Sequence, residues 1–287
     1  METADILKKV RKIEIKTRGL SQHIFSGQYH SAFKGRGMAF SEVREYQYGD
    51  DVRFIDWNVT ARFHHPYVKV FEEERELTVM LIIDVSASNF FGSHRQLKKD
   101  AITEIAAILA FSAIQNNDKV GVLFFSNKVE KYIPPKKGRS HILRIIRELL
   151  EFKATDTHTN ISEALRYFNN VHKRKCTAFI ISDFLDTNYE DAIKIVSQKH
   201  DLSALCIYDS LEKSIPNVGL LRLKDNESGK DFLFDTSSAA NRKIYEQYWD
   251  SHNKNTELIL KKYGLRHVHI ATQEDYVKHL IYLFKTH

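Results

Sequence analysis

The chain has 287 residues, of which 43% are hydrophobic and 28% are charged, and its formal net charge is +6. These values are ordinary for a globular protein with a sizeable core, built as one large domain or two modest ones, and they exclude a low-complexity chain. The sequence pI of about 9.0 is a mild basic bias that fits nucleic acid, an acidic partner or neither.

The two cysteines, Cys176 and Cys206, each lie in a short apolar run, "CTAFIIS" and "LSALCIY". Both are expected to be buried thiols, which is typical of a reducing compartment. The stretch "METADILKKVRKIEIKTRGL" has no apolar core of the signal-peptide type. No run approaches the roughly 20 apolar residues of a membrane span. A cytoplasmic, soluble protein without a membrane span is therefore expected, and a surface tether stays open as an alternative.

Residues 1–76 differ in pattern from the rest of the chain. A basic amphipathic helix is predicted over residues 4–17. The aromatic and charged stretch that follows shows no clear helices and is poor in aliphatic side chains. We expect irregular or β structure there, packed on the main domain.

From residue 77 onward, apolar runs of strand length alternate with segments of helical periodicity. The expected elements are a strand at 77–84, a helix at 97–116, strands at 118–126 and 128–135, helices at 140–152 and 160–172, a strand at 175–184, a helix at 188–200, a strand at 201–209, a hairpin at 219–235, a helix at 238–263, a strand at 266–272 and a helix at 274–286. The prolines of the strand at 128–135 favour a sheet edge or a strand end.

This alternation predicts an α/β fold, namely a doubly wound, mostly parallel sheet covered by helices on both faces. The predicted domains are residues 1–76, an N-terminal segment, and residues 77–287, the α/β domain. In such a sheet, ligands bind outside the carboxyl ends of the strands.

Oxygen-bearing side chains gather at these predicted ends. They are Asp84, Ser86 and Ser88 after the first strand, Thr159 before a helix, and Asp183 at the end of a later strand. Hard divalent cations prefer such an oxygen-only set, and Mg²⁺ needs about six oxygens near 2.0–2.1 Å. The prediction is a site for Mg²⁺, with Mn²⁺ or Ca²⁺ as alternatives.

Helix capping is the alternative interpretation of each of these residues alone, because Ser, Thr and Asp are common N-caps. The segment from Asp84 to Ser88 precedes a predicted helix, and Thr159 could cap another with Glu163 as its partner. The coincidence at three successive element ends favours the metal site.

The motif "DVSAS", followed by "TNISEAL" and "ISDF", resembles the metal-ion-dependent adhesion site of a von Willebrand factor A domain. That site has the pattern D-x-S-x-S, a distal Thr that opens a helix and a distal Asp after a strand. All five predicted ligands match it in order, although Thr157 competes with Thr159. Phe184 stands where the family usually has a glycine, which predicts a bulkier outer wall. The resemblance implies that the metal takes a Glu or Asp from a partner protein.

Residues 35–77, beginning "GRGMAFSEVREYQYGDD", resemble the signature of the bacterial family called domain of unknown function 58. Members of this family place the segment before a von Willebrand factor A domain. They are often encoded beside MoxR-type AAA+ ATPases and are thought to act as adaptor or chaperone-like partners of them. The resemblance implies a protein-binding module whose partner is a MoxR-type ATPase or its substrate.

Two other functions are weighed from the residues themselves. Asp50, Asp51 and Asp56 lie among several arginines and would suit a metal-dependent hydrolase or nuclease, although an internal ion-pair network is favoured. Basic segments such as "PPKKGRSH" would suit a nucleic-acid-binding scaffold, although solvated faces are favoured. The sequence has no P-loop, dinucleotide-binding, zinc-protease or serine-hydrolase motif, so an enzyme is not expected. The metal-dependent hydrolase or nuclease and the nucleic-acid-binding scaffold stay as the less favoured alternatives.

Overall fold

The computed structural model describes residues 10–14, 39–72, 77–93, 97–224 and 230–285. They belong to two compact units, a smaller one within 33–77 and a larger one that holds the rest, and each is described by itself. Residues 10–14 are helical, and the remainder of the helix predicted over 4–17 lies outside the described residues. The division into 1–76 and 77–287 stays a prediction, since most of residues 1–38 lie outside the described part.

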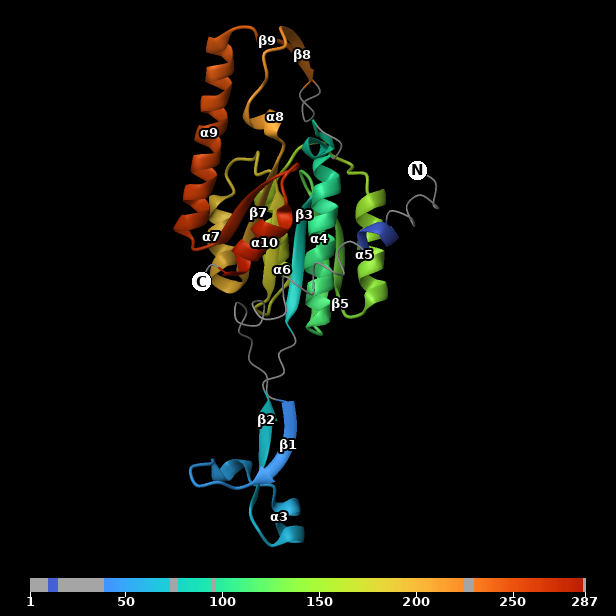
Figure 1. The fold of residues 1–287 in the computed structure, drawn as a ribbon, viewed down its shortest axis with the longest axis vertical. Coiled ribbons are helices and arrows are strands. Elements are labelled where there is room, and N and C mark those ends of the chain that lie inside the picture. The colour runs from blue at the N-terminus through green and yellow to red at the C-terminus, as the bar shows by residue number, and fades with distance from the viewer. Residues whose placement is uncertain (1–9, 15–38, 73–76, 94–96, 225–229, 286–287) are drawn as a thin grey trace. The chain divides into compact units, whose positions relative to one another are not determined.

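The larger unit is built on a six-stranded sheet in the order β10-β7-β6-β3-β4-β5. Figure 1 labels three of these strands, β7, β3 and β5. Neighbouring strands from β10 to β4 are parallel, and β5 pairs antiparallel with β4 at one edge. The strands are β3 (Thr78–Asp84), β4 (Lys119–Phe125), β5 (Val129–Lys136), β6 (Thr177–Ser182), β7 (Asp201–Tyr208) and β10 (Arg266–Ala271). The predicted doubly wound, mostly parallel α/β fold is confirmed, and the proline-containing strand does lie at an edge.

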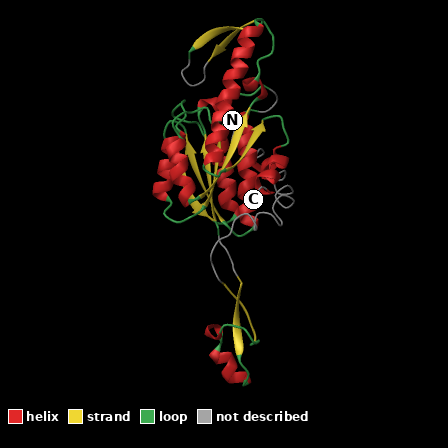
Figure 2. Cartoon of the chain, turned by 90° about the vertical axis from the view of Figure 1, so that its left-hand side faces the viewer, coloured by secondary structure: helices red, strands yellow, loops and turns green. Residues whose placement is uncertain are grey.

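Helices cover both faces of this sheet (Figure 2). They are α4 (Lys98–Gln115), α5 (Arg139–Glu151), α6 (Ile161–Val171), α7 (Glu190–Lys199), α9 (Ala239–Lys262) and α10 (Tyr276–Lys285), while the single-turn α8 (Ser210–Lys213) contacts α9. Met80 and Ile82 of β3 belong to the core cluster that includes residues of α6, α7 and α9, whereas Phe179 of β6 packs against Phe284 of α10. Because strands such as β3 are covered on both faces, they have continuous apolar runs.

Each element predicted after residue 77 has a counterpart in the structure. The predicted hairpin is β8 (Leu220–Lys224) paired antiparallel with β9 (Asp231–Asp235), and its turn lies outside the described residues. Cys176 and Cys206 are buried free thiols, as predicted. The short α8 and the 3₁₀ turn η2 (Ala87–Phe90) are additions to the prediction. Among the described helices, none is long and apolar enough to cross a membrane.

The smaller unit is an antiparallel pair of strands, β1 (Ala39–Glu45) and β2 (Tyr67–Glu72), joined through η1 (Val52–Phe54) and α3 (Trp57–Phe63). The expected β structure is present, but the expectation of no clear helices is wrong at α3. Asp56 explains this helix, because its side chain accepts bonds from the Asn58 and Val59 amides at 3.0 and 3.2 Å. Such an N-cap stabilises a helix start by about 1 kcal/mol.

Candidate metal centre

Asp84 is the last residue of β3 and its side chain is almost fully buried. One carboxylate oxygen accepts a bond from the Ser86 amide at 2.9 Å, and the other accepts one from the Ser182 hydroxyl at 2.7 Å. Ser182 ends β6, which pairs in parallel with β3. Both contacts therefore fix the Asp84 carboxylate at the carboxyl edge of the sheet, where ligands bind in this class of fold.

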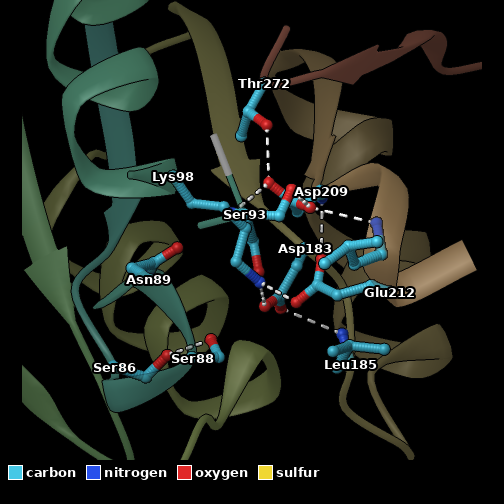
Figure 3. Close-up of polar contacts among 12 residues, drawn as sticks. Ser86, Ser88, Asn89, Ser93, Lys98, Asp183, Leu185, Asp209, Glu212 and Thr272 are labelled. Carbon is cyan, nitrogen blue, oxygen red and sulfur yellow. Dashed lines mark hydrogen bonds and ion pairs between the residues drawn. The ribbon is translucent and has the colours of Figure 1, made fainter. Parts of the chain in front are cut away.

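The hydroxyls of Ser86 and Ser88 face each other at 3.0 Å (Figure 3). Ser86 stands at the N-cap position of η2, but its side chain makes no capping bond, and the N-cap of α4, the helix predicted to follow, is Leu97. The capping alternative is thus wrong for this turn. Adjacent ligands of an octahedral Mg²⁺ at 2.0–2.1 Å lie about 2.9 Å apart, so the two hydroxyl oxygens have the spacing of neighbouring ligands.

Asp183 follows β6 and forms a buried ion pair with Lys98. The Lys98 Nζ atom lies 2.8 Å from Asp183 Oδ2 and 2.6 Å from Glu212 Oε1 (Figure 3). Burial alone would raise the pKa of Asp183, but the ammonium of Lys98 outweighs burial and lowers it, with help from a bond to the Ser88 hydroxyl. Burial would lower the pKa of Lys98, yet the two carboxylates raise it. Lys98 and Asp183 are therefore both charged.

The charge of Asp84, in contrast, is not compensated. Within the described part of the chain its carboxylate accepts hydrogen bonds from the Ser86 amide and from the Ser86 and Ser182 hydroxyls, and it forms no ion pair. Burial, and next the negative charge of Asp183, raise the pKa of Asp84 to about 7. A buried carboxylate of this kind takes up a proton or a cation. A divalent cation bound at this site would therefore neutralise the negative charge of Asp84.

Thr159 lies partly buried directly before Asn160, the N-cap of α6. The Asn160 side chain accepts a bond from the Glu163 amide at 2.9 Å, so Asn160 and not Thr159 caps the helix. The Ala87 amide donates to the Thr157 carbonyl at 3.1 Å, which joins this loop to the turn carrying the serines. The ligand role of Thr159, like that of the other four residues, stays a prediction.

Four of the five predicted ligands are linked by the hydrogen bonds described above, and all five offer oxygen. In the described residues, no group of three or more His, Cys, Asp or Glu side chains is placed to hold a metal ion. A metal here would depend on hydroxyls as well as carboxylates. That donor set fits Mg²⁺ or Ca²⁺ and does not fit Zn²⁺, which prefers nitrogen and sulfur.

Lys98 and Glu212 are site residues that the sequence interpretation missed. Lys98 is the first residue of α4 and is completely buried. It lies four residues before Ile102 and seven before Ile105, both of which are also buried. That spacing puts Lys98 on the apolar face of the helix, and a lysine on such a face signals a buried ion pair.

The expected bulkier outer wall at Phe184 is wrong. This side chain is buried in the core cluster with Tyr189, at 5.8 Å between ring centroids. Its φ of 57° is left-handed, a conformation that glycine adopts without steric cost. The position thus keeps the backbone that favours glycine but directs an aromatic ring into the core, away from the site.

The acids of the smaller unit do not converge on a common centre. Asp50 accepts two bonds from Arg44 at 2.7 and 2.8 Å, Asp51 pairs with Arg53, and Asp56 caps α3. The Arg44 and Arg53 partners lower the pKa values of Asp50 and Asp51. These contacts are the internal ion pairs and hydrogen bonds that the sequence favoured over a catalytic cluster.

The fold and the loop at its carboxyl edge define a doubly wound α/β protein with an oxygen-lined candidate cation site. The family model described as "Protein of unknown function DUF58" matches residues 42–255, most of the chain, and the protein belongs to that family. An uncharacterized protein of Mycobacterium tuberculosis is 28% identical over 278 residues, covering 95% of this chain and 86% of that protein.

Solved structures show the same fold. An aerotolerance-related membrane protein from Bacteroides fragilis superposes with a TM-score of 0.51 and 15% identity, covering 74% of this chain and 100% of that one. The conserved hypothetical protein BatB from Bacteroides thetaiotaomicron superposes with a TM-score of 0.50 and 15% identity, covering 72% of this chain and 96% of that one.

Proposed function

We propose that this protein is a protein-binding module that binds a carboxylate of its partner through a divalent cation. The ion would be held by Asp84, Ser86, Ser88, Thr159 and Asp183, with Mg²⁺ expected first and Mn²⁺ or Ca²⁺ as alternatives. One observation carries the proposal: the buried, uncompensated Asp84 carboxylate sits on the same turn as two serine hydroxyls 3.0 Å apart.

The residues of the site would neutralise the charge of the ion to different extents. Asp84 supplies a full negative charge, whereas the serines supply neutral oxygens. Asp183 already shares its charge with Lys98 at 2.8 Å, so it neutralises less of an added ion. An ion held in this way keeps excess positive charge and, when bound, offers an electrophilic position for an external carboxylate.

The proposed partner is a MoxR-type AAA+ ATPase or its substrate, for which this chain would act as an adaptor. Family membership over residues 42–255 supports this choice. The net charge of +6 would favour an acidic partner surface and speed the encounter. Electrostatic steering adds rate and specificity, while the ion would decide whether binding persists.

The test is capture of the MoxR-type ATPase from the same genome by the purified chain, in Mg²⁺ and in EDTA. Asp84→Ala is expected to abolish the Mg²⁺-dependent part of the capture. Asp191→Ala, at an exposed acid on α7, is the matched control and is expected to behave as wild type. Circular dichroism verifies that both variants fold. Equal capture by wild type and Asp84→Ala, with or without chelator, sinks the proposal.

A further inference from the structure

A pocket of about 690 Å³ opens beside the turn that carries Ser86 and Ser88. Ala87, which lies between the two serines, forms one part of its lining and Thr157 forms another. The hydrogen bond between these two residues joins the loops on which the proposed ligands lie. The pocket therefore lies next to the loops that carry three of the proposed ligands, Ser86, Ser88 and Thr159.

The main wall of the pocket is apolar. Phe90, Leu150 and Phe152 line it, and Phe90 is 50% exposed although it is a large apolar side chain. Lys99 holds this wall together, because its ammonium lies 5.4 Å from the Phe90 ring centroid and 2.9 Å from the Phe152 carbonyl oxygen. The lysine thus connects η2 to the end of α5.

The charges around the pocket favour a neutral occupant. Two cations, Lys99 and Lys153, and two acids, Glu151 and Asp156, line it, so their charges balance. Its volume falls within the roughly 300–1,000 Å³ of ligand pockets. An apolar wall with balanced charge suits a bulky side chain better than a charged group.

We infer that this pocket, formed around Phe90, Leu150 and Phe152, receives an aromatic or large aliphatic side chain next to the partner's acidic residue. This inference rests on the proposed function, because the metal-bound carboxylate would place the neighbouring residue beside the pocket. The partner segment would therefore be recognised as a pair, an acidic residue and an adjacent bulky apolar one.

Short peptides test the inference. The probes are N-acetyl-Asp-Phe-amide, N-acetyl-Asp-Ala-amide and the two peptides of reversed order, titrated into the full chain and followed by amide NMR shifts. A Phe-containing peptide is expected to bind at least about tenfold more tightly than its Ala counterpart, since burial of one aromatic ring changes a binding constant by that order. N-acetyl-Phe-amide, which has no carboxylate, is expected to bind more weakly than either Phe-containing dipeptide.

Variants of the pocket residues test whether the pocket causes the preference for Phe over Ala. Phe90→Ala, and Ala154→Trp, which fills the pocket from another wall, are each expected to reduce the Phe-over-Ala ratio to near one. Ile195→Ala is the matched control, because Ile195 is 51% exposed on α7, and is expected to keep the ratio. An unchanged ratio in Phe90→Ala and Ala154→Trp overturns the inference, as does equally tight binding of N-acetyl-Phe-amide.

Repeating the peptide titrations in Mg²⁺ and in EDTA separates the inference about the pocket from the proposed metal-dependent function. A Phe preference that depends on Phe90 but is unaffected by EDTA supports the pocket and contradicts the proposed metal-dependent function. Binding that EDTA abolishes, with no Phe preference at any stage, overturns the pocket and leaves the proposed function standing.

Discussion

Replacement of Lys98 by Met removes the only cation described in contact with Asp183. The side chain is fully buried and its ammonium contacts Asp183 at 2.8 Å and Glu212 at 2.6 Å. Met keeps most of the aliphatic volume, so packing loss is small. What remains is a pair of buried carboxylates without their counterion, near Asp84.

Removal of one partner from a buried ion pair costs about 3–5 kcal/mol. For a unit of this size each kcal/mol lowers the melting temperature by about 2–4 °C, so the variant is expected to melt roughly 6–20 °C lower. If a divalent cation binds beside Asp183, Mg²⁺ is expected to raise the melting temperature of Lys98→Met more than that of wild type. Scanning calorimetry and urea denaturation, each with and without Mg²⁺, measure both effects.

Lys243→Met is the matched control, because Lys243 is exposed on α9. Its expected change in stability is within about 0.5 kcal/mol. The double variant Lys98→Met with Asp183→Asn is expected to lose less stability than the two single changes added together, since the partners are in contact. If Lys98→Met is as stable as Lys243→Met, the reasoning about the buried cluster is refuted.

Phe184→Gly is expected to be about 1 kcal/mol more stable than Phe184→Ala, because both variants lose the ring but only Gly adopts the φ of 57° without strain. Urea denaturation measures the two stabilities, and a Phe184→Ala variant at least as stable as Phe184→Gly contradicts this prediction. Burial, and next Lys199, lower the pKa of His200 to about 4. Stability is thus lost as pH falls from about 6.5 towards 4, by up to about 1.4 kcal/mol per pH unit. His200→Gln is expected to reduce the slope of the free energy of unfolding against pH between about 4 and 6.5. An unchanged slope contradicts the role of His200.

Much of the fold was predictable because its strands are buried on both faces and its helices have clear periodicity. The continuous apolar run of β3 predicted a strand covered on both faces, and the prolines of β5 predicted a strand at the edge of the sheet. Helix α3 was not predicted, because it is short and its cap, Asp56, lies among acids that suggested ion pairs. Local sequence specifies such a helix only through one capping side chain.

The candidate site was predictable where it depends on a local motif and not where it depends on distant contacts. Asp84, Ser86 and Ser88 lie within one turn, so their spacing places them together. Lys98 meets partners that are 85 and 114 residues away in sequence, which no local pattern reveals. Phe184 was misplaced because the direction of one side chain depends on its left-handed backbone and on the core it enters.

The central claim is that the oxygen cluster around Asp84 binds a divalent cation. Isothermal titration of the metal-free protein with Mg²⁺ and Mn²⁺ tests it directly, with Asp84→Asn as the matched variant that keeps the shape of the side chain. The account predicts a single ion bound by the wild-type chain and binding at least about tenfold weaker in Asp84→Asn, with unchanged circular dichroism. Absence of binding to wild type, or equal affinity in the variant, would contradict it.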